Sequence, residues 1–162
     1  QPTEGGHGLH MRAINRVRAA GSIERAVESG LIGSGIMHTL VTRKVPYVLA
    51  GSIRDDGPLP GVLSDTLAAQ DAMREHTVKA TGAIFVATAL HAIAVGNMLP
   101  AFYLDTLGVP QPLMTVCVDQ TEFVVNKLRD RGTHQAYGVV TNAQDFMHVL
   151  RFYCERWEQA SA

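Results

Sequence analysis

The chain has 162 residues, which is the size of one ordinary domain with room for a hydrophobic core. Hydrophobic residues make up 46% and charged residues 18%, a balance that excludes an intrinsically disordered chain and is typical of a folded, soluble protein. The formal net charge of -1 gives no electrostatic basis for binding nucleic acid or an anionic membrane, so we expect neither partner.

Cysteine and histidine usage gives no sign of a metal site. Cys117 and Cys154 form neither a CxxC motif nor a zinc spacing, which predicts two reduced thiols in a cytoplasmic protein. His7 and His10 are three residues apart, but no third ligand type accompanies them, so a surface helix is favoured over a metal site. No apolar stretch reaches the length of a membrane span, and no signal peptide is visible.

The N-terminal part of the chain is predicted to be helical. After a flexible lead-in over residues 1–6, apolar residues recur at helical spacing from His7 to Ala20, and Gly21 ends that helix. Ser22 is placed to cap a second short helix, and Ser34 to cap a third. We expect residues 7–162 to form a single α/β domain.

The pattern then changes to short apolar runs that alternate with helices. The predicted strands are 45–50, 82–87, 113–118 and 137–140. The predicted helices are 62–76, a short one through Ala94 and Asn97, 121–129, and 142–159.

This alternation predicts a parallel sheet with flanking helices and right-handed crossovers, a Rossmann-like α/β fold. A GxGxxG fingerprint is absent, because Gly33-Ser34-Gly35 precedes a helix but does not follow a strand. Three helices precede the first predicted strand, which suggests that the chain is the C-terminal part of a larger unit.

Ligands of open α/β sheets bind outside the carboxyl ends of the strands. Polar or small residues follow all four predicted strands, as a ligand site requires, although loops are polar for other reasons too. These residues are Gly51, Ser52, Arg54, Asp55 and Asp56; Thr88, His91 and Asn97; Asp119 and Gln120; and Thr141 and Asn142.

Asp119 and the Arg54-Asp55-Asp56 group have two interpretations each. An acid directly at a strand terminus can hold two ribose hydroxyls, but Asp119 can equally cap the helix that begins near Thr121. Adjacent carboxylates beside an arginine can act as proton acceptor and anchor, or the same group can be a loop tied by its own salt bridge. His91 is a candidate hydrogen-bond partner of substrate or cofactor, or a structural residue at the start of a helix.

Several runs of the sequence together resemble one family. They are Gly6-His7 through Ala19-Ala20-Gly21-Ser22; Ser34-Gly35-Ile36-Met37; Val48-Leu49-Ala50-Gly51-Ser52-Ile53-Arg54-Asp55-Asp56-Gly57-Pro58-Leu59-Pro60; Leu90-His91-Ala92-Ile93-Ala94-Val95-Gly96-Asn97-Met98-Leu99-Pro100; and Val116-Cys117-Val118-Asp119 with Lys127-Leu128 and Asp130-Arg131-Gly132. The chain resembles the LOR/SDH proteins, whose members include archaeal-type ornithine cyclodeaminases and the C-terminal domain of cyanobacterial arginine dihydrolases. The resemblance extends from about Gly6 to Leu150, with an insert at Ala101 to Gln111.

The resemblance implies an NAD-binding fold similar to that of deoxyhypusine synthase, and a cytoplasmic enzyme of amino-acid metabolism that converts ornithine to proline and ammonia. NAD takes a hydride from the substrate, the side-chain amine attacks the imine, ammonia leaves, and the hydride returns. The older family name implies a lysine–oxoglutarate reductase or saccharopine dehydrogenase instead. A third alternative is an NAD-binding or assembly module without catalysis of its own.

The resemblance also implies which residues form the site. The implied cofactor-binding residues are Ala50, Gly51, Ser52, Ile53, Arg54, Thr88, Leu90, Asn97, Asp119 and Gln120. The implied catalytic residues are Asp55 or Asp56, with His91 assisting. Expected partners are a small amino-acid substrate and further copies of the chain in a homo-oligomer, or a second chain that supplies an N-terminal part.

Overall fold

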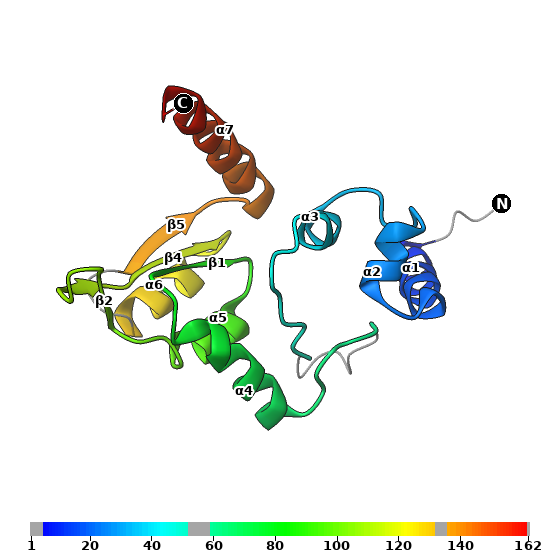
Figure 1. Ribbon diagram of the computed structural model, residues 1–162, viewed down its shortest axis with the longest axis horizontal. Helices are drawn as coiled ribbons and strands as arrows, with labels where there is room; N and C mark the ends of the chain where they lie inside the picture. Colours follow the sequence, from blue (N-terminus) through cyan, green and yellow to red (C-terminus); the bar gives the residue numbers. More distant parts are fainter. Residues whose placement is uncertain (1–4, 52–58, 132–135, 162) are drawn as a thin grey trace. The chain divides into compact units, whose positions relative to one another are not determined.

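The computed structural model describes residues 5–51, 59–131 and 136–161. The chain forms two compact units, Gln1–Met73 and Arg74–Ala162 (Figure 1). No helix in the described part of the chain is both long enough and apolar enough to cross a membrane.

The first unit is built on three short helices, α1 (Gly6–Ala20), α2 (Ile23–Glu28) and α3 (Ile36–Thr42). They confirm the helical start that the sequence predicts. The core of this unit is small, and its buried members come from α1 and α2. They are Val17, Ile23 and Ala26, packed against the half-buried Ala20, Leu31, Ile32, Met37, Val41, Leu49 and Leu59.

The ends of these helices follow the predicted caps with one exception. Gly21 ends α1 with a φ of 87°, and the Ser22 hydroxyl accepts a hydrogen bond from the Arg25 amide at 3.1 Å at the start of α2. The prediction that Ser34 caps the third helix is wrong. Gly35 occupies the cap position with a φ of 93°, and its carbonyl accepts from both the amide and the hydroxyl of Thr39.

The prediction of a strand at residues 45–50 is also wrong. The segment makes one isolated parallel bridge, between Ala50 and Leu63. The Leu63 amide donates to the Leu49 carbonyl at 2.8 Å, and the Gly51 amide donates to the Leu63 carbonyl at 2.9 Å. A strand needs a continuous ladder on a neighbour, and this segment has only that single link. The predicted helix 62–76 is observed as α4 (Thr66–Thr77).

The second unit contains a three-stranded parallel sheet in the order β1-β4-β5. The strands are β1 (Gly82–Val86), β4 (Met114–Asp119) and β5 (Ala136–Val140). The helices are α5 (Ala89–Gly96), α6 (Glu122–Arg131) and α7 (Ala143–Ser161). The predicted parallel sheet with flanking helices is therefore confirmed for the last three strands, with strand boundaries that move by at most one residue.

A small antiparallel hairpin, β2 (Phe102–Leu104) and β3 (Pro110–Pro112), overlaps the insert at Ala101 to Gln111 and was not predicted. Asp105 organises its turn. The carboxylate accepts from the amides of Leu107 and Val109, both at 2.9 Å, and from the Gln111 side chain at 3.0 Å. These bonds, the one from Val109 first, hold the pKa of Asp105 below its ordinary value.

One face of the sheet packs closely on α6. Cys117 of β4, the register neighbour of Gly138, is 7% exposed, and Val125 of α6 is 3% exposed. Gly138 of β5 lies directly under Val125, and a Cβ at Gly138 would overlap with the Val125 Cγ1 atom. In Figure 1, α5 and α6 lie on the same side of the sheet, while α7 leaves from its other side.

The opposite face of the sheet carries apolar side chains that remain exposed. Ile84, Val116 and Tyr137 are register neighbours on adjacent strands, so their side chains share this face. Ile84 is 52% and Tyr137 is 58% exposed, and Met114 on the same face is 52% exposed. Val118, on the same face, is 1% exposed, so within the described chain this face is open around Met114, Ile84 and Tyr137 and covered at the carboxyl end of β4.

The contact between Gly138 and Val125 leads to a stability prediction. Gly138→Ala should lower the free energy of unfolding by about 1–3 kcal/mol in urea denaturation, because α6 must move away from the sheet to admit the new methyl group. Gly96→Ala is the control, since nothing lies within 4 Å of a Cβ there, and it should be neutral or stabilising. The Gly138→Ala/Val125→Ala double variant should cost less than the sum of the two single variants, and strict additivity would contradict the explanation.

Candidate functional site

The carboxyl ends of the three parallel strands lie side by side in the second unit. Two backbone hydrogen bonds continue beyond the strands. The Ala87 amide donates to the Val118 carbonyl at 2.9 Å, and the Thr141 amide donates to the Asp119 carbonyl at 3.0 Å. These bonds hold the first residue after β1 and the first residue after β5 against the end of β4, which fixes the three polar loops at one edge.

The chain turns sharply from β1 into α5. Ala87 has a φ of 56°, a left-handed conformation that is uncommon for a residue with a side chain. Thr88 follows as the N-cap of α5, and its hydroxyl accepts from the His91 amide at 3.4 Å. The start of α5 therefore presents its remaining backbone amides at the strand ends, where they can bind a negatively charged group.

Asp119 is the last residue of the central strand, and both interpretations of its role are compatible. Its Oδ1 atom accepts from the amide and from the hydroxyl of Thr121, both at 3.0 Å, which caps the turn before α6. Within the described chain no hydrogen bond is made to its Oδ2 atom. One carboxylate oxygen is thus structural, and the other remains an acceptor at the strand end. Burial raises the pKa of the neighbouring Cys117 thiol, and the Asp119 charge raises it further.

The third strand end is built in the same way. Asn142 follows Thr141, and its side-chain oxygen accepts from the Gln144 amide at 2.8 Å at the start of α7. All three loops are therefore held by a side chain that accepts a hydrogen bond from the backbone. These bonds restrain the three loops in the absence of a ligand, and restraint of this kind lowers the entropic cost of binding.

The remaining predicted residues of the second unit lie at different places. Leu90 and His91 are on the first turn of α5, and both are exposed, next to Thr88. Gln120 is exposed and directly follows Asp119. Asn97 is the C-cap of α5, so the full length of that helix, about 12 Å, separates it from the strand ends. The structure thus brings the predicted residues together at one edge, except for Asn97.

Two predicted residues lie in the first unit, and the others of the long motif lie outside the described residues. Ala50 and Gly51 are held against Leu63 by the bridge described above. A Cβ at Gly51 would lie 3.1 Å from the Leu63 carbonyl oxygen, so this position favours glycine for steric reasons. The predicted site residues Ser52, Ile53, Arg54, Asp55 and Asp56 fall outside the described ranges.

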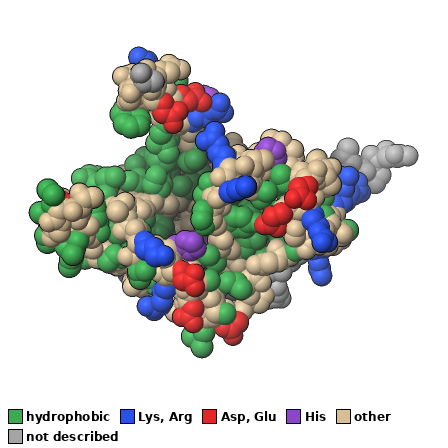
Figure 2. All heavy atoms as spheres, viewed as in Figure 1, with side chains coloured by type: hydrophobic (Ala, Val, Ile, Leu, Met, Phe, Trp, Pro, Cys, Tyr) green, Lys and Arg blue, Asp and Glu red, His purple; other side chains and the backbone are tan. Residues whose placement is uncertain are grey.

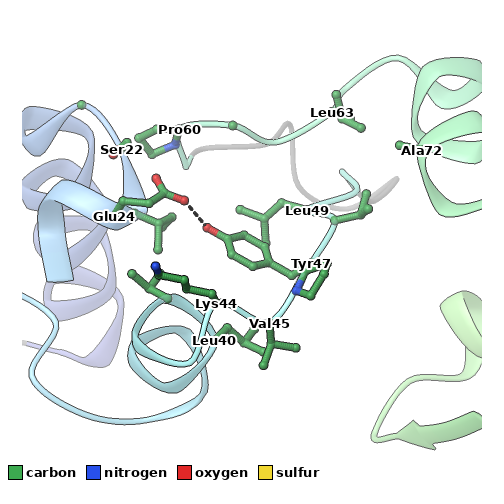
Figure 3. A pocket seen from close by; sticks show the side chains of 16 residues that line it. Ser22, Glu24, Leu40, Lys44, Val45, Tyr47, Leu49, Pro60, Leu63 and Ala72 are labelled. Atoms are coloured by element: carbon green, nitrogen blue, oxygen red, sulfur yellow. Dashed lines mark hydrogen bonds between the residues drawn. The ribbon is translucent and has the colours of Figure 1, made fainter. Parts of the chain in front are cut away.

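A pocket of about 820 Å³ lies within the first unit, and the sequence did not indicate it (Figure 3). Its polar lining comes from Glu24, Lys44 and Tyr47, and its apolar lining includes Leu49 and Leu63. Tyr47 lies in a segment with strand-like composition. Its hydroxyl is the only feature of that segment's sequence that indicates a polar contact. The partner is 23 positions away in the sequence, which no local pattern can reveal.

Tyr47 and Glu24 form the best-defined polar contact of that pocket. The Tyr47 hydroxyl donates to Glu24 Oε1 at 2.7 Å, as the dashed line in Figure 3 marks. This bond stabilises the neutral phenol beside the carboxylate and raises the pKa of Tyr47 to about 12, with smaller contributions from burial and from the Glu24 charge. The same bond lowers the pKa of Glu24.

The two regions differ in what they can do chemically. The strand-end edge offers a carboxylate oxygen and helix-terminal amides, a combination that can bind hydroxyl groups and anionic groups of one ligand. Cys117 is buried and Cys154 is exposed, and no disulfide joins them. Among the described residues there is no group of three His, Cys, Asp or Glu side chains that could hold a metal ion.

A parallel sheet with flanking helices and a polar edge at its strand ends defines the chain as a Rossmann-fold domain. The comparison with family models makes this specific. The model described as "Arginine dihydrolase ArgZ-like, C-terminal, Rossmann fold" matches residues 1–150, and the chain belongs to that family.

Relatives and solved structures of the same family are longer than this chain. Ornithine cyclodeaminase from Methanopyrus kandleri is 46% identical over 150 residues, which are 93% of this chain and 34% of that protein. The bifunctional arginine dihydrolase/ornithine cyclodeaminase AgrE from Nostoc is 45% identical over 90% of this chain and 19% of its own length. The chain therefore spans about a third or less of these curated relatives.

Two crystal structures confirm the fold. The LOR/SDH protein from Methanococcus maripaludis has a TM-score of 0.82 and 45% identity, over 98% of this chain and 45% of that one. The ternary complex of AgrE with ornithine and NAD+ has a TM-score of 0.81 and 42% identity, over 96% of this chain and 21% of that one.

The contact between Tyr47 and Glu24 leads to a titration prediction. Glu24→Gln should lower the pKa of Tyr47 from about 12 toward the ordinary value of 10, because the carboxylate no longer stabilises the neutral phenol. NMR of ring-labelled tyrosine, assigned with Tyr47→Phe, measures this pKa. Because the folded-state pKa is raised, the contribution of Tyr47 to stability is complete below about pH 10 and is lost toward pH 12. Glu28→Gln, at the end of α2, should leave the titration unchanged.

Proposed function

We propose that the chain is the NAD-binding, C-terminal part of an ornithine cyclodeaminase-like enzyme of the cytoplasm, which converts ornithine to proline and ammonia. The observation that carries this proposal is the Oδ2 oxygen of Asp119, which accepts no hydrogen bond from the described residues and lies at the end of the central strand, next to the start of α5. Support also comes from relatives named ornithine cyclodeaminase and from the AgrE structure with ornithine and NAD+.

The residues at the strand ends fit the adenosine and phosphate parts of NAD. Asp119 Oδ2 would accept from the ribose hydroxyls, while Oδ1 continues to cap the turn at Thr121. The amides at the start of α5, beside Thr88, would bind phosphate oxygens in place of a glycine-rich fingerprint. Bound NAD would supply a hydride acceptor that later returns the hydride. Gln120 and Leu90, both exposed at this edge, would line the bound dinucleotide.

The substrate-side residues of the proposal follow from the resemblance. Asp55 or Asp56 would bind the amine of ornithine or take its proton, and His91, exposed on the first turn of α5, would assist. Ala50, Gly51, Ser52, Ile53 and Arg54 would form the loop beside the cofactor, and Asn97 would contribute from the far end of α5. The active protein would be a homo-oligomer.

A second candidate function is an oxidoreductase of the lysine–oxoglutarate reductase or saccharopine dehydrogenase type. It is favoured by the name of the Methanococcus maripaludis structure, a LOR/SDH protein with a TM-score of 0.82. A third candidate function is a non-catalytic NAD-binding module. The polar edge at the strand ends lies wholly within the second unit, whereas the chain spans 34% of the length of the Methanopyrus kandleri relative.

These candidates differ in an experiment on the isolated chain. Incubation with NAD and ornithine should release ammonia and proline without net NADH if the chain carries the cyclodeaminase reaction. Net NADH formation from saccharopine would favour the dehydrogenase instead. NAD binding without any turnover would favour the module, and the enzyme would then require the rest of a longer protein.

Asp119→Asn tests the cofactor site itself. Asparagine keeps an oxygen that accepts from Thr121, so the turn is preserved, but an NH₂ group replaces the second acceptor oxygen. We expect the Kd for NAD to rise about 10- to 100-fold in calorimetry, because a charge-assisted hydrogen bond to the ribose is lost. Asp71→Asn, an exposed carboxylate on α4, is the matched control and should bind NAD as the unchanged chain does. Equal affinity in the Asp119 variant would remove Asp119 from the cofactor site.

A further inference from the structure

Helix α7 carries an apolar stripe that is half-buried at Phe146 and Leu150 and exposed over the rest of its length in the described chain. Over its 19 residues, Ala143–Ser161, no side chain is buried. The stripe consists of Phe146, Val149, Leu150, Tyr153 and Trp157, which recur at spacings of three and four and so share one face of the helix. Val149, Tyr153 and Trp157 are 53%, 64% and 71% exposed.

The opposite face of α7 has the polar character expected of a solvated surface. Arg151 and Glu155 form an ion pair at 2.7 Å there, and both side chains are more than half exposed. Figure 2 shows hydrophobic side chains gathered below α7, over the strands of the open sheet face. The helix is therefore strongly two-sided, with one face suited to water and one suited to another apolar surface.

The charges beside the stripe indicate what that other surface is. Asp145 directly precedes Phe146, and Arg156 directly precedes Trp157, so both charges lie on the same flank of the stripe. They stand about three helical turns apart, near opposite ends of the stripe. The other flank carries the uncharged Met147 and Cys154.

A second copy of the same helix matches this arrangement in one orientation. In an antiparallel pair related by a two-fold axis, the same flank of each helix faces the other, and the start of one stripe meets the end of its partner. Asp145 of one copy then lies beside Arg156 of the other, twice per pair. In a parallel pair, the charged flank would instead face the uncharged flank of Met147 and Cys154.

The amount of apolar surface suits such a pair. A buried aromatic side chain removes about 150–250 Å² from water. Tyr153, Trp157 and the half-buried Phe146 from two copies together contribute at most about 1,000 Å², which is the lower range of specific protein interfaces. The match to the family model ends at residue 150, so Tyr153, Arg156 and Trp157 lie beyond the part of the chain that defines the family.

We propose that α7 is a self-association surface, through which two copies of this chain pair antiparallel along the stripe, with Asp145 of each copy beside Arg156 of the other. The apolar stripe supplies the affinity, and the two charge pairs at its ends set the orientation. This proposal names the surface through which the homo-oligomer of the proposed function would form. It rests on α7 alone and not on cofactor binding.

Sedimentation velocity of the 162-residue chain over a micromolar concentration range tests the surface. The unchanged chain should be a dimer, and Trp157→Asp should raise the dimer dissociation constant at least tenfold. Leu67→Asp is the matched control, because Leu67 is equally exposed at 71% on another helix, and it should leave the constant unchanged. Circular dichroism checks that each variant is folded. A monomeric unchanged chain, or a dimer that survives Trp157→Asp, would overturn the proposal.

A charge exchange tests the orientation. Asp145→Arg and Arg156→Asp should each raise the dissociation constant several-fold, and the double variant should return it to within about threefold of the original. Arg151→Asp, on the solvated face, should have no effect on dimer formation. Failure of the double variant to recover would exclude the antiparallel pair. Loss of the dimer with Tyr137→Asp, on the open sheet face, but not with Trp157→Asp would assign the interface to the sheet. NAD affinity measured in parallel separates these outcomes from failure of the cofactor site.

Discussion

The second unit depends on the double pairing of its central strand. β4 is hydrogen-bonded to β1 on one side and to β5 on the other, and Cys117 and Val118 are its most buried residues. Because both neighbours run parallel to it, their carboxyl ends arrive at the same edge. The bonds from Ala87 and Thr141 to the carbonyls of Val118 and Asp119 extend this register into the loops. The candidate site is thus a consequence of backbone pairing, and its side chains are positioned by it.

Local sequence signals predicted those elements whose formation is decided locally. The apolar runs of β1, β4 and β5 and the periodic segments of α6 and α7 were found within a few residues of their bounds. The segment 45–50 has the composition of a strand, but composition cannot supply a ladder partner, and only the bridge to Leu63 forms. The β2–β3 hairpin was missed for the opposite reason. Its strands are three residues each, β3 contains two prolines, and the side chain of Asp105 closes the turn.

The candidate site was predicted in outline and not in detail. The rule that ligands bind at strand ends located Thr88 and Asp119 correctly at one edge. It offered two roles for Asp119 as alternatives, a helix cap and a ligand contact. A carboxylate has two oxygens, and the structure uses Oδ1 for the cap, so both roles fit one side chain. The left-handed Ala87 could not be foreseen, because alanine carries no preference for that conformation.

The two faces of the parallel sheet differ in how much apolar surface they leave exposed. One sheet face is closed by α6, whereas the other leaves Ile84, Met114 and Tyr137 about half exposed. Parallel sheets rarely expose such a face to water, so the sheet is complete only when a further layer covers it. The chain spans about a third of the length of its relatives, so they contain enough additional protein for such a layer. The strand-end edge needs no such layer for its geometry, because every hydrogen bond that holds it lies within the second unit. The proposed contacts of Asp119 and of the start of α5 with NAD therefore need only residues of the second unit.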